Sequence, residues 1–246
     1  MKKLLSFILL LVGLAQAAVD TNSGTSCLPA GTGGNVAGNR PMTVAGWVNS
    51  PSATSFKTFF AQDGGPWKMF VYAGSPCTLG HLDFRNTNTD VCSSQTVSGS
   101  TWEFIAAVVT TGNVHFLTLA NNATTPTTDD VSNSTTFGSA GRTVGGAFQI
   151  NCSFGMSGAI ANLAVWGTVA LSDAELVAYA RGGPYAVGRA ITVFYPLYFT
   201  SGSSGTTYAN FTAATQNNNL TVASGTTAVN PGTHCPCGNP WPAGNR

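Results

Sequence analysis

Short segments in which apolar residues dominate or alternate with polar ones recur along this chain, and clusters of turn-forming residues separate them. Runs of this length and spacing predict β-strands joined by hairpins and loops. The predicted strands span residues 42–49, 56–62, 67–74, 79–85, 102–110, 113–120, 158–167, 191–197 and 220–224. Hairpin turns are expected at residues 63–66 and at Thr111–Gly112, and the polar residues 121–142 predict a long loop.

One stretch changes from alternating to helical periodicity after residue 167. Ser172 and Glu175 have the spacing of a capping box, in which serine accepts a hydrogen bond from the amide three residues on and glutamate accepts from the serine amide. A pair of glycines, Gly182–Gly183, ends the pattern. We therefore expect one short helix near residues 172–181 and interpret Glu175 as a cap. The positions expected to face the core are Leu176, Val177 and Ala180.

The N-terminal residues predict export. A short apolar run, Leu4–Leu14, follows two lysines and is followed by small residues, the pattern of a secretory signal peptide. We predict that residues 1–17 are this signal peptide, cleaved after Ala17, and that residues 18–246 form a single domain. The run is shorter than the ~20 residues that span a bilayer, and no later stretch is long enough. The expectation is a protein without a membrane span that is secreted, extracellular or periplasmic.

The low fraction of charged residues limits the classes of partner that the chain can bind. Charged residues make up only 8 % of the chain, against about 25 % in typical soluble domains. No basic stripe appears, which argues against nucleic acid and anionic membrane as partners. Thr, Ser, Asn and Gly supply the polar surface instead, which favours a neutral partner such as a glycan.

The chain has six cysteines, and an exported chain meets oxidising conditions in which disulfides are the default. The disulfide candidates are Cys27, Cys77, Cys92, Cys152, Cys235 and Cys237. We expect Cys77 to pair with Cys92, which closes a local loop. A bond between Cys235 and Cys237 would be strained because one residue separates them. Residues 234–237 could instead hold a metal, although zinc sites usually combine four ligands at wider spacing.

Four sequence blocks in order carry a family resemblance: MTVAGWVN, TWEFIAAVV, SGAIANLAVWGTVALSDAEL and VFYPL. Together they resemble laminin-G-like domains of the concanavalin A-like jelly-roll superfamily, over about residues 27–230. The resemblance implies an all-β jelly-roll sandwich of two packed antiparallel sheets, about six strands each, with one short helix. Members are mostly sugar-binding or protein-binding modules, while some are glycosidases and some bind calcium.

The chain departs from the catalytic and calcium-binding patterns of that superfamily. The glucanase branch carries two glutamates and an aspartate close together on one strand, whereas Glu103 and Glu175 are the only glutamates here. We therefore predict no catalytic residue and no cofactor. Calcium-binding members often have an acidic residue where this chain has Ala161. Loop aspartates could still bind calcium, and the weak candidates are Asp63, Asp129 and Asp130. His81 and His115 are interpreted as structural.

Sugar recognition needs an aromatic platform beside amides and hydroxyls. Trp67 follows a hairpin turn, and Arg85 and Asn86 lead from a strand into a polar loop, so these three are the candidate ligand-binding residues. The sequence favours a secreted, non-catalytic recognition module that binds a glycan or a cell-surface protein through loops at one edge of the sandwich. The alternative is a structural or assembly subunit of an extracellular envelope, appendage or particle. A glycoside hydrolase is the least favoured class.

Overall fold

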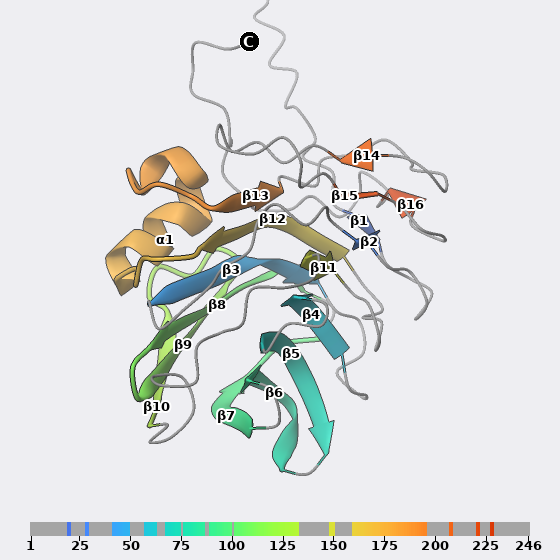
Figure 1. Cartoon of the computed structure of the whole chain (residues 1–246), viewed down its shortest axis with the longest axis vertical. Coiled ribbons are helices and arrows are strands. Elements are labelled where there is room, and N and C mark those ends of the chain that lie inside the picture. Colours follow the sequence, from blue (N-terminus) through green and yellow to red (C-terminus); the bar gives the residue numbers. More distant parts are fainter. Residues whose placement is uncertain are drawn as a thin grey trace, which may run out of the picture.

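The chain folds into two antiparallel sheets packed face to face, a β-sandwich (Figure 1). The computed structural model describes residues 19–20, 28–29, 41–49, 57–62, 67–74, 76–86, 89–99, 101–132, 148–150, 159–195, 207–208, 220–221 and 227–228. The predicted all-β jelly-roll class is confirmed. The helix is also where the sequence predicts it, since α1 spans Asp173–Gly182 and is followed by a short 3-10 turn, η2 (Pro184–Ala186).

Within the described ranges, the larger sheet has eight strands and the smaller has six. The larger sheet has the order β10 (Thr127–Ser132), β9 (Asn113–Ala120), β8 (Glu103–Thr110), β3 (Met42–Asn49), β12 (Ala159–Trp166), β1 (Val19–Asp20) and β16 (Thr227–Ala228), and β13 (Val193–Tyr195) also pairs with β12. The smaller sheet has the order β2 (Leu28–Pro29), β11 (Phe148–Ile150), β4 (Lys57–Gln62), β5 (Trp67–Gly74), β6 (Cys77–Asn86) and β7 (Thr89–Thr96). A separate pair joins β14 (Thr207–Tyr208) and β15 (Leu220–Thr221).

Three central strands of the larger sheet, β3, β8 and β12, are buried on both faces. One face packs against the smaller sheet in a cluster that includes Phe59, Phe84 and Ile105. The other face packs against α1 in a second cluster that includes Trp47 and Tyr179. A strand covered on both faces is apolar at most positions, and the buried polar exceptions in these strands are Thr43, Glu103 and Asn162. This explains why these strands appear in the sequence as continuous apolar runs rather than alternating ones.

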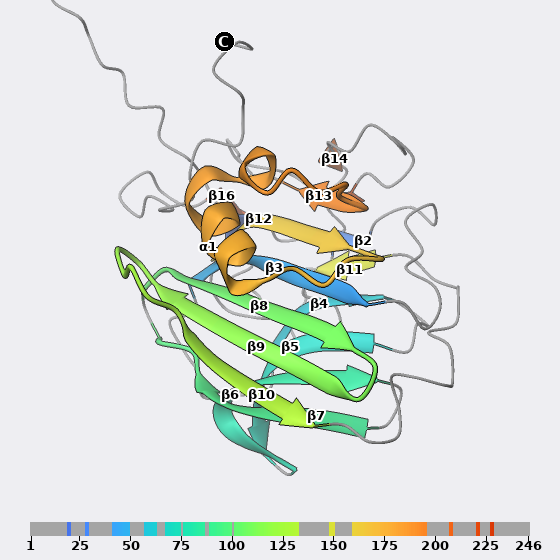
Figure 2. The ribbon, with the colours of Figure 1, turned by 90° about the vertical axis from the view of Figure 1, so that its left-hand side faces the viewer.

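The helix covers the outer face of the larger sheet (Figure 2). Its capping box forms as predicted, because the Ser172 and Glu175 side chains each accept from the other residue's backbone amide. Two buried contacts then fasten the helix to the sheet. The Tyr179 hydroxyl donates to the Asn162 carbonyl at 2.6 Å, and the Trp47 indole N–H donates to the Ala180 carbonyl at 3.2 Å.

Seven of the described strands were not predicted: β1, β2, β7, β10, β11, β14 and β16. The two longest of them, β7 and β10, are edge strands. β10 lies inside the predicted loop 121–142, and β7 follows β6. β10 has the sequence TTDDVS, whose residues are exposed or half-buried, so no apolar alternation marks it. Contacts between these two edges close one side of the sandwich: Asp129 of β10 accepts from the Ser94 amide of β7 at 2.6 Å and from the Ser93 hydroxyl at 3.1 Å.

The predicted Cys77–Cys92 disulfide is present, with the two Cα atoms 5.2 Å apart. The other four cysteines lie outside the described residues. Trp47, Trp102 and Trp166 are buried core residues. Across the described ranges, no helix combines the length and the apolar character needed to cross a membrane.

Candidate binding site

Trp67 and Asn86 lie at the same end of the six-stranded sheet. Trp67 opens β5 and is in register with Asn86, the last residue of β6, which is in register with Thr89 of β7. Directly opposed residues of neighbouring strands share a face of the sheet. An aromatic residue, an amide residue and a hydroxyl residue therefore occupy one row at the end of three neighbouring strands.

Arg85 belongs to the next row, which joins Lys68 of β5, Arg85 of β6 and Asp90 of β7. Successive residues of a strand alternate between faces, so Arg85 belongs to the opposite side of the sheet from Asn86. The Arg85 guanidinium donates to the Asp90 carboxylate in an ion pair, with 27 % and 9 % of the two side chains exposed. Of the three predicted ligand-binding residues, the register thus brings Trp67 and Asn86 into one row and separates Arg85 from them.

Beneath this ion pair lies a buried carboxyl group that the sequence analysis did not single out. Asp83 is fully buried, and its Oδ1 accepts from the Val91 amide at 3.2 Å. Burial, together with charge repulsion from the nearby Asp90, raises the pKa of Asp83 to about 8, while Arg85 opposes the shift. A carboxyl with this pKa keeps its proton at neutral pH.

The calcium candidates do not form a shared ligand set within the described residues. Asp63 lies outside those residues. Asp129 and Asp130 are neighbours on β10 and use different partners: Asp129 accepts from Ser93 and Ser94, while Asp130 accepts from Asn113 and contacts His115. Burial tends to raise the pKa of Asp129, but the hydrogen bonds outweigh it and lower the value. Hydrogen bonds also lower the pKa of Asp130.

His115 links β10 to the start of α1. Its Nδ1 lies 2.9 Å from Asp130 Oδ1, and its Nε2 lies 2.8 Å from Asp173 Oδ1 in the first turn of the helix. The imidazole side chain is 19 % exposed, while the two carboxylates are largely open to solvent. The sequence interpretation of His115 as structural agrees with this geometry, because the ring holds an edge strand against the helix.

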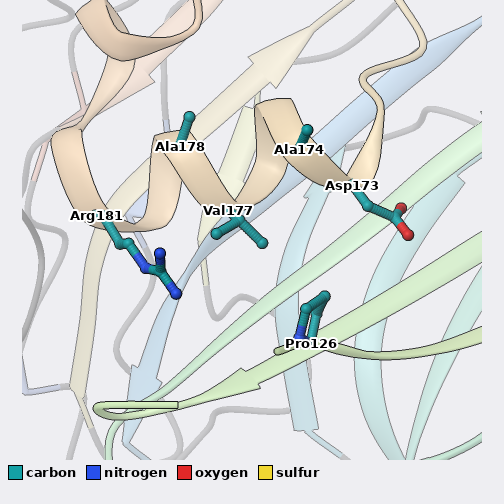
Figure 3. A pocket seen from close by; sticks show the side chains of 6 residues that line it. All are labelled: Pro126, Asp173, Ala174, Val177, Ala178 and Arg181. Atoms are coloured by element: carbon teal, nitrogen blue, oxygen red, sulfur yellow. The ribbon is translucent and has the colours of Figure 1, made fainter. Parts of the chain in front are cut away.

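A shallow groove of about 450 Å³ runs along α1 beside this link (Figure 3). Its lining residues are Pro126, Asp173, Ala174, Val177, Ala178 and Arg181. Val177 points from the helix toward Pro126, and Asp173 and Arg181 lie at opposite ends of the helix (Figure 3). Arg181 donates to the carbonyl oxygens of Ala123 and Thr124, at 3.2 and 3.0 Å. The groove is therefore largely apolar. The Arg181 guanidinium at one end of it is already hydrogen-bonded to the segment between β9 and β10.

Both glutamates of the chain have structural partners. Glu175 caps α1, and its Oε1 also accepts from Arg189 at 2.7 Å. Glu103 is buried at the start of β8, where its Oε2 accepts from the Ser98 amide at 2.6 Å. Burial raises the pKa of Glu103, although the Ser98 hydrogen bond opposes that shift. Each carboxylate thus has a contact that accounts for its presence without catalysis.

The fold defines a class, the antiparallel jelly-roll sandwich, and a family model places the chain within it. Residues 20–177 match the model described as the concanavalin A-like lectin/glucanases superfamily, and the chain belongs to this superfamily. No curated protein matches the chain in sequence.

Solved structures share the fold at low sequence identity. A Bacteroides ovatus protein to which carbohydrate binding is ascribed matches with a TM-score of 0.63 and 15 % identity over 87 % of this chain and 60 % of that one. The chain thus spans less than two thirds of that protein. A SAP-like pentraxin from Limulus polyphemus matches with a TM-score of 0.47 and 15 % identity over 68 % of this chain and 82 % of that one. The LG1-3 region of the laminin alpha2 chain matches with a TM-score of 0.46 and 13 % identity over 62 % of this chain and 31 % of that one.

Proposed function

We propose that this protein is a secreted, non-catalytic recognition module that binds carbohydrate at the end of its six-stranded sheet where Trp67 and Asn86 lie. The row formed by Trp67, Asn86 and Thr89 is the observation that carries the proposal. An aromatic ring can stack on the C–H face of a sugar, while an amide and a hydroxyl can bond its hydroxyl groups. The low charge of the chain suits a neutral glycan.

Two further observations support the choice of a binding module. Carbohydrate binding is ascribed to the Bacteroides ovatus protein of similar fold. The two glutamates serve the backbone at Ser172 and Ser98, and hydrolysis with retention would need two carboxylates about 5–5.5 Å apart.

A glycan array followed by calorimetry tests the proposal. The mature protein should bind a neutral polysaccharide, and Trp67→Ala should weaken that binding about tenfold or more, equivalent to ~1.4 kcal/mol. Tyr185→Ala is the matched control, because Tyr185 is 58 % exposed and lies on η2, outside the six-stranded sheet. Equal losses in both variants, or none in Trp67→Ala, would contradict the site. An array without any signal, together with a stable oligomer in solution, would favour the assembly-subunit alternative.

Secretion is the second part of the proposal. The Cys77–Cys92 disulfide suits an oxidising compartment, and the apolar run at residues 4–14 suits a cleaved leader. Mass spectrometry of protein recovered from outside the producing cell should give an N-terminus at Ala18. Recovery of the intact chain from Met1 would refute the cleavage.

A further inference from the structure

Three potential metal ligands meet where β6 and β7 pair. The Sγ atoms of Cys77 and Cys92 and a carboxylate oxygen of Asp83 all lie within 4.8 Å of one another. The strand register explains the meeting, since Asp83 is directly opposite Cys92, and the disulfide brings Cys77 to the same place. Cys77 and Asp83 are buried, while Cys92 is only half-buried. The cluster is therefore interior but can be reached from the Cys92 side.

One atom of this cluster is not accounted for by the fold. Asp83 Oδ1 accepts from the Val91 amide, but Oδ2 is buried without a hydrogen-bond partner. A buried polar atom in this condition is costly, and native proteins contain few of them. The disulfide sulfurs beside it carry no proton to donate. The oxidised cluster thus keeps a buried carboxyl oxygen of Asp83 without a hydrogen-bond partner.

We propose that reduction of the Cys77–Cys92 disulfide creates a site for a thiophilic divalent cation such as Zn²⁺, with Cys77, Cys92 and Asp83 as its protein ligands. A dithiol supplies two electrons and two protons to the S–S bond and is itself oxidised to a disulfide, which leaves two thiols. Metal binding then releases the two thiol protons and the Asp83 carboxyl proton to solvent. Water takes the fourth position of a tetrahedral site.

The distances fit this coordination. Zinc binds thiolate sulfur at ~2.3 Å and carboxylate oxygen at ~2.0–2.2 Å, so the ligand atoms of a tetrahedral site are about 3.4–3.8 Å apart. Ligand atoms that already lie within 4.8 Å of one another can reach this geometry by small side-chain rotations. The Cα atoms of the two cysteines, 5.2 Å apart, can stay nearly in place.

The same site would serve two compartments. The disulfide joins residues 15 apart in sequence and ties the β6 and β7 strands together. In a reducing compartment that bond is absent, and a bound cation would hold the same two strands together. After export, a disulfide-bearing oxidant would take two electrons from the two thiolates and be reduced to a dithiol, which forms the Cys77–Cys92 bond and releases the cation. The cluster therefore acts as a redox-exchangeable clip between β6 and β7.

Cobalt and zinc titrations of the full chain test this proposal. The chain is reduced with a phosphine under anaerobic conditions and titrated with Co²⁺, whose thiolate charge-transfer absorption reports sulfur ligation, and then with Zn²⁺ against a chromophoric chelator. The reduced protein should bind one more equivalent than the Cys77→Ser/Cys92→Ser variant, which corrects for the other cysteines. The oxidised protein should lack that equivalent.

Variants at two aspartates make the test specific. Asp83→Asn keeps both cysteines and should weaken the extra equivalent on the order of tenfold or more. Asp130→Asn, which changes an aspartate whose partners Asn113 and His115 lie on β9 of the larger sheet, should leave it unchanged. Equal stoichiometry in the wild type and the double serine variant, or wild-type affinity in Asp83→Asn, would overturn the proposal. If the double serine variant fails to fold, the comparison of the two aspartate variants still decides.

Discussion

Asp83 lies on β6, which pairs with β5 on one side and β7 on the other. It has no exposed surface. Burial, reinforced by Asp90, raises its pKa from the ordinary value of 3.8 to about 8. Between those two pH values the folded chain keeps a proton that the unfolded chain has lost. The free energy of unfolding should therefore fall as pH rises through this window, because the unfolded state binds fewer protons.

The magnitude follows from the size of the shift. Each pH unit in which the folded state holds one extra proton lowers the free energy of unfolding by about 1.4 kcal/mol. From about pH 4 to about pH 8 the loss from Asp83 would amount to about 5 kcal/mol. Above about pH 8 both states are ionised at this residue and the contribution stays constant. Asp83→Asn has the same shape, keeps an acceptor for the Val91 amide and cannot ionise, so it should lack this slope.

Denaturant unfolding of the wild type and Asp83→Asn, with the disulfide intact, measures the effect. The free energy of unfolding of Asp83→Asn minus that of the wild type should rise by about 1.4 kcal/mol per pH unit between pH 5 and pH 7.5. Asp129→Asn is the matched control: the pKa of Asp129 is lowered, so its stabilisation is lost only as pH falls below the ordinary range. A flat difference between the wild type and Asp83→Asn over this window would refute the reasoning.

Three further substitutions probe the cap of α1, the packing between the two sheets, and the contact of α1 with the larger sheet. Glu175→Ala should lower the free energy of unfolding by about 0.5–2 kcal/mol through the lost cap, as measured by thermal melts. Glu175→Gln keeps an acceptor for the Ser172 amide and should cost less. Gly46→Ala should cost about 1–3 kcal/mol, because its Cβ would lie 3.0 Å from Phe59; an unchanged denaturation midpoint would contradict this. Tyr179→Phe should cost about 1–2 kcal/mol by removing the hydroxyl that donates to the buried Asn162 carbonyl, and hydrogen exchange in α1 should accelerate.

Much of the fold could be predicted because its central elements carry local signals. Ser172 and Glu175 encode the helix start by spacing alone, and the structure confirms the capping box. The turn at Thr111–Gly112 is also confirmed, with Gly112 at a φ of 81° that glycine adopts without strain. Local chemistry of this kind needs no partner elsewhere in the chain, so it can be recognised in the sequence.

The edge strands could not be predicted because their stability comes from neighbours. β10 is polar at every position except Val131, and it forms because its backbone pairs with β9 and because Asp129 bonds to β7. The same limit applies to the candidate sites. The sequence of β6 does not distinguish Asp83 from the other polar residues of that strand. Only the pairing of β6 with β7 places Asp83 opposite Cys92. His115 likewise meets Asp173 across 58 residues of sequence.

The sequence by itself determined the class of fold, the capped helix and the local disulfide, since each depends on residues close together in the chain. Tertiary structure decided which strands are buried on both faces, which polar strands close the edge, and that Arg85 and Asn86 belong to opposite sides of one sheet. The physical reason is that burial and ligand geometry depend on pairing register. A shift of one residue moves every side chain to the other face, and long-range packing, not local propensity, fixes that register.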